Sequence, residues 1–245
     1  MSRTPLLLLP GWGMPSSVWK PMLPELERSF ELLFVDWCGI VDLEGFQRQV
    51  LSVIHRNSLD RFSVMGWSLG SLAALQTAAM YPSRVGNLIL FGATSRFISD
   101  EKATEPAGWP KRIVERMKRQ LLKDPTQTLD AFYHSMFSED EKLKALDEIF
   151  INQLHEDQPY SVEELVAGLD YLIEASARKD VNLIQSQVLL IHGEADQICP
   201  PEASRIIASG VSGPVHLELL ANTGHIPFFT QPQQCLSVIK EALKL

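Results

Sequence analysis

Short apolar runs alternate with amphipathic stretches along the first hundred residues. The runs are typical of strands buried on both faces, and they cover residues 6–9, 31–35, 62–66 and 87–91. Apolar positions recur at helical spacing between them, in residues 18–28, 45–56 and 69–80. The pattern returns near the end of the chain, with strands at 187–191 and 215–220 and helices at 201–209 and 232–244. This alternation predicts an α/β fold, in which helices flank a mostly parallel sheet.

The middle of the chain lacks the strand pattern and is predicted to be helical. Residues 109–122 carry one apolar stripe, and Asp124-Pro125 is typical of the start of a second helix. Two capping boxes, Ser138 with Glu141 and Ser161 with Glu164, predict two more helices. We therefore expect a four-helix cap at residues 99–180, inserted between two parts of an α/β core at 1–98 and 181–245.

Composition and charge exclude several classes of protein. The 245 residues include 22 basic and 30 acidic side chains, a net charge of −8 that argues against a nucleic-acid binder. No apolar run approaches the ~20 residues of a membrane span. The three cysteines, at positions 38, 199 and 235, have neither a metal-ligand spacing nor an even number for disulfides. We expect a cytoplasmic monomer without metal or cofactor.

A candidate nucleophile lies between a predicted strand and a predicted helix. Residues 66–70 read Gly-Trp-Ser-Leu-Gly, the G-x-S-x-G pattern, directly after the strand at 62–65 and before the helix at 69–80. Strand, tight turn and helix are the setting of a nucleophile elbow. The glycines Gly66 and Gly70 suit a turn so tight that neighbouring backbone leaves no room for a Cβ. Ser68 is therefore the predicted nucleophile.

A serine hydroxyl needs a base, and one histidine follows the last predicted strand. His225 lies in a turn-rich loop at the sheet edge where Ser68 is also expected, whereas His55, His155 and His216 fall within helices or a strand. Asp196 follows the strand at 187–191 on the same edge and would orient the imidazole; Glu194 is the rival carboxylate. The order serine, aspartate, histidine is that of an α/β-hydrolase triad.

The attacked carbonyl needs backbone donors for its developing negative charge. The N–H of Leu69, the residue after the nucleophile, is one candidate. The N–H of Trp12, in the Gly11-Trp12-Gly13 turn after the first strand, is the other.

These motifs resemble the α/β-hydrolase superfamily and, within it, the pimeloyl-[acyl-carrier-protein] methyl ester esterases of biotin synthesis. Tryptophan in both the oxyanion turn and the elbow makes the resemblance more specific. It implies that Trp12 and Leu69 contact the acyl ester together with Ser68 and His225. It also implies that a cap segment lines the acyl tunnel, and its counterparts here are Phe132, Tyr133, His134, Ser135 and Met136. The apolar pocket is expected to include Trp12, Trp67, Phe132, Tyr133, Met136 and Phe228.

The resemblance further implies an acyl-carrier protein as the partner that presents the ester. Cap arginines grip this acidic carrier in the family, but Gln127 and Ala131 stand where two of them would fall. Residues 108–123 instead carry six basic side chains and one acidic one. We expect Arg112, Arg116 and Arg119 within this segment to attract the carrier.

The expected activity is that of a serine carboxylesterase acting on a small-molecule or carrier-linked acyl ester, with no nucleic-acid or membrane partner. A general esterase or thioesterase with another acyl substrate is an alternative. A lyase that uses the same triad, as in menaquinone synthesis, is a second; a basic pocket would favour it, whereas an apolar pocket favours esters. A binding protein on a hydrolase scaffold is a third, and an intact triad argues against it.

Overall fold

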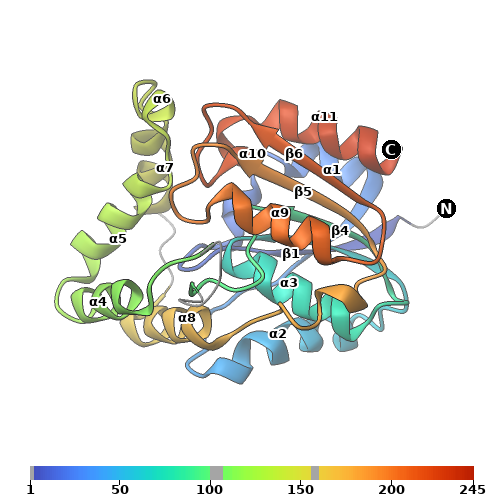
Figure 1. Ribbon diagram of the computed structural model, residues 1–245, viewed down its shortest axis with the longest axis horizontal. Helices are drawn as coiled ribbons and strands as arrows, with labels where there is room; N and C mark the ends of the chain where they lie inside the picture. The colour runs from blue at the N-terminus through green and yellow to red at the C-terminus, as the bar shows by residue number, and fades with distance from the viewer. Residues whose placement is uncertain (1–2, 100–106, 156–159) are drawn as a thin grey trace.

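The computed structural model describes residues 3–99, 107–155 and 160–245, and its centre is a six-stranded sheet (Figure 1). The strands lie in the order β2-β1-β3-β4-β5-β6, and every pair among them is parallel. Their bounds are β1 (Thr4–Leu9), β2 (Phe30–Phe34), β3 (Phe62–Trp67), β4 (Val85–Phe91), β5 (Gln187–Gly193) and β6 (Val215–Leu220). The predicted parallel sheet is confirmed.

Helices cover both faces of the sheet, which explains why its central strands are mostly apolar. One face carries α1 (Leu23–Ser29) and α11 (Pro232–Leu243), which are joined by an ion pair between Glu25 and Lys240 at 2.6 Å (Figure 1). The other carries α2 (Leu43–Arg56), α3 (Leu69–Met80) and α9 (Pro201–Gly210). Every residue of β3 is buried between the two layers.

The helix predicted at residues 18–28 is divided in the structure. A 3-10 turn, η1 (Ser16–Trp19), precedes α1, and the residues between them do not form a helix. Pro21 and Pro24 account for the break, because proline lacks the N–H that a helix interior requires. Proline is tolerated in the first turn, where Pro24 lies.

The cap between β4 and β5 contains five helices in the described residues, one more than predicted. They are α4 (Lys111–Leu121), α5 (Pro125–Ser135), α6 (Glu139–Lys142), α7 (Leu146–His155) and α8 (Val162–Glu174). The helix that Ser138 caps ends after one turn, and Ala145 adopts a left-handed backbone with φ of 54° before α7 begins. No glycine or proline marks this break in the sequence.

The cap leaves and re-enters the core at adjacent points. Arg96 and Ser176 form an isolated antiparallel bridge, and the N–H of Ala177 donates to the carbonyl of Ser95 at 2.7 Å. Short elements complete the described chain: η2 (Val181–Leu183) before β5, and α10 (Pro227–Thr230) after β6. In the described ranges, no helix has the length and apolar character needed to span a bilayer.

Candidate active site

Ser68 lies in a strained turn at the carboxyl end of β3. Its backbone φ is 55° and its ψ −118°, and α3 begins at the next residue. A Cβ on Gly66 would lie 2.5 Å from the carbonyl oxygen of Gly70, and a Cβ on Gly70 would lie 2.1 Å from that of Leu9. Both glycines are therefore required by close backbone approach, as the sequence predicts. The turn presents Ser68 above the sheet edge.

The side chain of Ser71 forms hydrogen bonds that stabilise the turn. Its buried hydroxyl donates to the carbonyl of Ser68 at 2.9 Å and lies 3.3 Å from that of Phe91. The N–H of Ser68 donates to the same Phe91 carbonyl, which belongs to the neighbouring strand β4. The elbow is thus tied to the adjacent strand by both backbone and side chain.

His225 and Asp196 meet in the structure, although 29 residues separate them. Nδ1 of His225 lies 2.7 Å from Oδ2 of Asp196, and both side chains are fully buried. The two residues follow β6 and β5, whose carboxyl ends share the edge where Ser68 lies. The rival carboxylate Glu194 is exposed. Of the two candidate carboxylates, Asp196 is the one that contacts the imidazole in the described residues.

Three further donors hold the Asp196 carboxylate. Oδ1 accepts from the N–H groups of Ile198 and Cys199 at 2.8 and 2.9 Å, and Oδ2 also lies 3.1 Å from Nε2 of His192. Since Nε2 of His192 also faces the Cys199 carbonyl at 2.8 Å, this nitrogen carries the proton. Burial opposes ionisation of Asp196, but the electrostatic attraction of His225 and the hydrogen bonds from both histidines outweigh it. The pKa of Asp196 is therefore held well below its usual range.

The other ring nitrogen of His225, Nε2, is buried and has no hydrogen-bond partner among the described residues. Leaving a buried polar atom without a partner is costly, and such atoms are concentrated at functional sites. Because Asp196 occupies Nδ1, Nε2 is the nitrogen free to take a proton.

The turn after β1 supplies the second candidate for the oxyanion site. Trp12 is buried, its indole N–H donates to the carbonyl of Leu165 in α8 at 2.8 Å, and its ring meets Phe132 edge-on at 5.0 Å. Leu69 is the first residue of α3, and the first N–H groups of a helix have no partner within it. The two predicted donors therefore come from separate elements, the turn after β1 and the first residue of α3.

A small apolar pocket opens at Ser68. Its volume is about 20 Å³, room for about one water molecule. Apart from Ser68 its lining is entirely uncharged and apolar: Trp12, Phe97, Trp109, Val114, Met117, Phe132, Leu169, Leu172 and Ile198.

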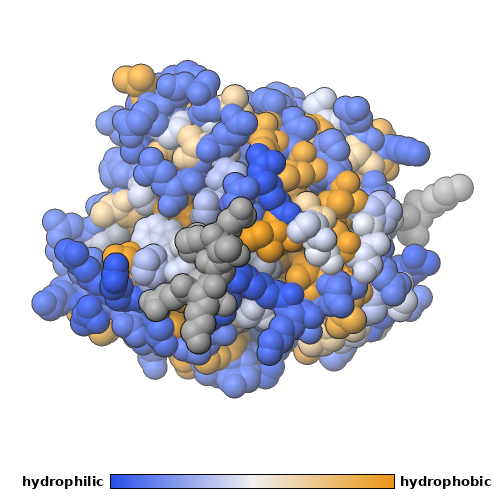
Figure 2. Space-filling view, viewed as in Figure 1, coloured by the Kyte–Doolittle hydropathy of each residue, from blue (hydrophilic) through white to orange (hydrophobic). Residues whose placement is uncertain are grey.

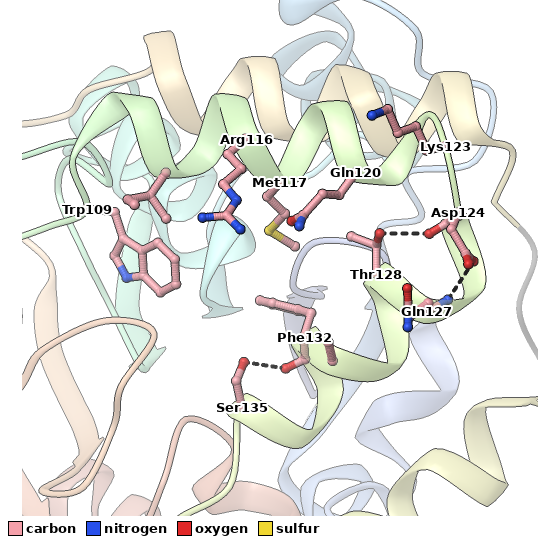
Figure 3. A pocket seen from close by; sticks show the side chains of 12 residues that line it. Trp109, Arg116, Met117, Gln120, Lys123, Asp124, Gln127, Thr128, Phe132 and Ser135 are labelled. Atoms are coloured by element: carbon pink, nitrogen blue, oxygen red, sulfur yellow. Dashed lines mark hydrogen bonds between the residues drawn. The ribbon is translucent and has the colours of Figure 1, made fainter.

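A larger groove of about 570 Å³ runs between α4 and α5 (Figure 3). Trp109, Met117 and Phe132 line both cavities, so these side chains lie between the groove and the pocket. Figure 3 shows Arg116 and Gln120 pointing from α4 into the groove.

Residues 4–232 match the α/β hydrolase fold family. The chain belongs to this family. Pimeloyl-[acyl-carrier protein] methyl ester esterase from Nitrosomonas europaea is 31% identical to this α/β hydrolase over 240 residues, which cover 95% of this chain and 92% of that protein. The protein of that name from Legionella pneumophila (strain Corby) is 27% identical over 248 residues, covering 98% and 95%. The solved esterase EaEST from Exiguobacterium antarcticum has the same fold, with a TM-score of 0.85, 22% identity, and coverage of 100% of this chain and 93% of that one.

The cap segment 132–136 of this α/β hydrolase reaches the cavities through only two side chains. Phe132 lines both cavities, and Ser135 lines the groove. Tyr133 packs edge-on against Phe150 of α7, and His134 is half exposed and bonded to Asp147 at 2.8 Å. Consecutive residues of a helix point about 100° apart, so five in a row cannot face one cavity.

Three other residues predicted for the acyl pocket lie beneath it. Trp67 and Phe228 are buried against each other at 5.2 Å, and the Trp67 indole N–H donates to the carbonyl of His225. The carbonyl of Met136 accepts from the N–H of His225 at 2.7 Å. None of the three lines the pocket or the groove; Trp67 and the Met136 carbonyl instead hold the backbone of His225, and Phe228 packs against Trp67.

The other residues that line the pocket at Ser68 are not among the predicted site residues, although several of them belong to apolar stripes visible in the sequence. Val114 and Met117 belong to the stripe recognised in α4, and Leu169 and Leu172 have the same spacing in α8. An apolar stripe shows that a helix face is covered, but not that a cavity lies there. Trp109 has a second role, since its indole N–H donates to the carbonyl of Ile198 beside Asp196 at 2.7 Å.

In the described part of the chain, no group of three histidine, cysteine or acidic residues could hold a metal ion.

Proposed function

We propose that this protein, a carboxylic ester hydrolase of the α/β-hydrolase family, hydrolyses the methyl ester of a pimeloyl group carried on acyl-carrier protein in biotin synthesis. The observation that carries the activity is the buried pair of His225 and Asp196, in which Nε2 of His225 has no partner among the described residues. Trp67, the residue before Ser68, donates its indole N–H to the carbonyl of His225. The names of the relatives support the substrate, and the 31% identity extends over 95% of the chain.

In the proposed mechanism, Ser68 attacks the ester carbonyl while Nε2 of His225 takes its proton. The N–H groups of Trp12 and Leu69 would hold the oxyanion of the tetrahedral intermediate. The protonated imidazole, stabilised by Asp196, gives its proton to the departing methoxide, and methanol leaves. Water, deprotonated by the same nitrogen, then releases the free carboxylate and restores the serine.

The uncharged pocket favours a neutral ester over the alternatives. A lyase acting on a polycarboxylate would need cations near Ser68, and none lines this pocket. A methyl ester suits it, whereas a free terminal carboxylate would be buried without a partner at high cost. The product is therefore bound less well than the substrate. A thioesterase remains the second candidate, because the same apolar lining would accept a thioester.

The charges of α4 support a carrier-linked substrate. Lys111 and Lys118 pair with Glu174 and Asp170 of α8 at 3.3 and 2.6 Å. The other four cations have no ion pair in the described residues: Arg112, Arg116, Arg119 and Lys123. Arg112, Arg116 and Arg119 are four and three residues apart, which places them on one face of α4, and Lys123 follows just after the helix ends, so the four form a basic stripe. Figure 2 shows a largely hydrophilic surface where α4 lies in Figure 1.

This stripe borders the groove between α4 and α5. Arg116 and Lys123 line the groove, and its only carboxylate, that of Asp124, accepts from the N–H of Gln127 as a helix cap. We therefore assign the groove to the arm that joins the acyl group to the carrier, and the stripe to the acidic carrier itself. Trp109, Met117 and Phe132 must rotate to admit the acyl chain, because the pocket they close is so small.

Charge reversal tests this docking surface. Arg116→Glu combined with Arg119→Glu should lower kcat/KM on the carrier-linked ester about tenfold or more, since each reversal exchanges an attraction for a repulsion worth up to ~1 kcal/mol. Hydrolysis of p-nitrophenyl butyrate should stay unchanged. Lys144→Glu with Lys179→Glu, two exposed cations outside the groove lining, is the matched control. Equal losses on both substrates would remove carrier docking on α4 and leave a small-molecule esterase.

Complementation tests the physiological role. The wild-type gene should restore growth without biotin to a strain that lacks this esterase, and Ser68→Ala should not. Activity on p-nitrophenyl esters without complementation would point to a general esterase. We also propose a cytoplasmic location, supported by three free cysteines; the monomeric state stays a prediction.

A further inference from the structure

The loop that carries His225 is hydrogen-bonded to the cap. The N–H of His225 donates to the carbonyl of Met136, and the hydroxyl of Ser138 donates to the carbonyl of Asn222, both at 2.7 Å. Met136 ends the cap helix whose Phe132 side chain lines both cavities. The general base and the acyl-binding helix therefore share direct backbone contacts.

A buried carboxylate completes this connection. Oε2 of Glu141 accepts from the N–H of Gly224 at 2.9 Å and from that of Ser138 at 2.8 Å. Glu141 is only 3% exposed. Gly224 directly precedes His225, and a Cβ there would lie 2.3 Å from the carbonyl oxygen of Met136 and 2.9 Å from Oε2 of Glu141.

Helix capping does not account for the burial of Glu141. The bond to Ser138 completes an ordinary capping box, which exposed helix ends form equally well. Ser161 and Glu164 form the same box at the start of α8, where Ser161 is exposed and Glu164 is half-buried. Burying a carboxylate is costly unless its hydrogen bonds compensate. Oε1 of Glu141 has no partner within the described chain, so Oε2 alone provides that compensation.

We propose that Glu141 is a positioning residue for the proposed hydrolysis: by holding the N–H of Gly224, its carboxylate fixes the imidazole of His225 relative to the cap. The proposal rests on the assignment of His225 as the base. It makes the position of the cap and the position of the base depend on one side chain. A small displacement of a catalytic group is enough to slow a reaction strongly.

Three variants test the proposal, with p-nitrophenyl butyrate as substrate. Glu141→Ala removes the acceptor and should lower kcat about 30-fold, while KM changes less than about twofold. Glu141→Asp keeps the charge, but its shorter side chain moves the carboxylate away from the N–H of Gly224. This variant should lower kcat about tenfold. Glu141→Gln keeps an acceptor oxygen and a capping box, and should retain at least about a third of the wild-type kcat.

Glu164→Ala is the matched control, because Glu164 belongs to the same motif and also accepts from a core backbone amide, that of Gly39. It should keep the wild-type kcat. Proton NMR gives an independent readout: the low-field signal of the Nδ1 proton between His225 and Asp196 should shift or broaden in Glu141→Ala and stay unchanged in Glu164→Ala.

A wild-type kcat in Glu141→Ala with only a lower melting temperature would overturn the proposal. Should that variant fail to fold, Glu141→Asp decides, and an unchanged kcat and low-field signal in it would overturn the proposal equally. Failure of the proposed function is a different result. The wild type would then hydrolyse no ester, whereas the NMR comparison would still report whether Glu141 positions the imidazole.

Discussion

Replacing Asp196 with asparagine tests the central hydrogen-bond arrangement of the site. The carboxylate faces four donors, two on each oxygen: the N–H groups of Ile198 and Cys199, and the ring nitrogens of His225 and His192. An asparagine side chain has one accepting oxygen and one NH2 group, which cannot accept. One pair of donors must therefore face an NH2 group in the variant.

The two orientations of the amide have different consequences. With NH2 toward the backbone donors, two bonds to a charged group are lost, each worth ~1.5–3 kcal/mol, so the protein is destabilised by ~3–6 kcal/mol. With NH2 toward His225, Nδ1 must become an acceptor and the ring proton moves to Nε2. That nitrogen can then no longer take a proton from Ser68, a change that costs about 10⁴ in kcat in the serine-protease triad.

The second orientation should dominate, because backbone donors are fixed whereas an imidazole can change tautomer. Asp196→Asn should therefore keep most of its thermal stability and lose about 10³- to 10⁴-fold in kcat/KM. Initial rates on p-nitrophenyl butyrate and thermal unfolding measure the two quantities. Glu194→Gln, at the exposed carboxylate of the same turn, should stay within about twofold of wild type. An Asp196→Asn variant within tenfold of the wild-type rate would refute this reasoning.

Three other predictions concern the cavity, the thiols and acid stability. Phe132→Ala should raise the rate on p-nitrophenyl octanoate relative to acetate about tenfold, the value of roughly two more buried CH2 groups, because Phe132 separates groove from pocket; an unchanged ratio would exclude this route. A thiol reagent should modify one cysteine in the native protein and three in denaturant. Cys38 is exposed, whereas Cys199 and Cys235 are buried, and burial raises the pKa of Cys235 to about 12. Finally, the lowered pKa of Asp196 contributes stability at pH values above about 4 that is lost as the pH falls further. Urea unfolding between pH 5 and 3 should therefore show a flatter loss in Asp196→Asn, and an equally steep loss would contradict this contribution.

The strands and the tight turn at residues 66–70 could be predicted because their sequence patterns are local. The strands are short and mostly apolar, and the pattern G-x-S-x-G at residues 66–70 follows one of them directly. Gly66 is required by an approach to Gly70, within five residues, although Gly70 is required by the distant Leu9. Asp196 and His225 were placed by the topology, since the carboxyl ends of parallel strands meet at one edge. These inferences needed no knowledge of side-chain packing.

Features that depend on packing between distant segments were missed. The break at Ala145, where the backbone is left-handed between α6 and α7, carries no glycine or proline signal. The resemblance implies that all five residues of the cap segment 132–136 line the tunnel, whereas helical geometry directs Tyr133 and His134 away from the cavity. The capping box predicted where α6 begins, but not that Glu141 reaches Gly224, 83 residues away.

The bridge at the base of the cap makes this segment a replaceable module. Arg96 and Ser176 already hold its two ends together, so the length of the intervening chain adds little to the entropy of closing the loop. A cap from another hydrolase could thus be grafted at these two positions to change acyl selectivity. The graft must supply counterparts of the cap groups that hold the loops around the site: the Leu165 carbonyl, the Trp109 indole, the Met136 carbonyl, the Ser138 hydroxyl and the Glu141 carboxylate. A cap without them would leave a folded core whose reacting groups are no longer aligned.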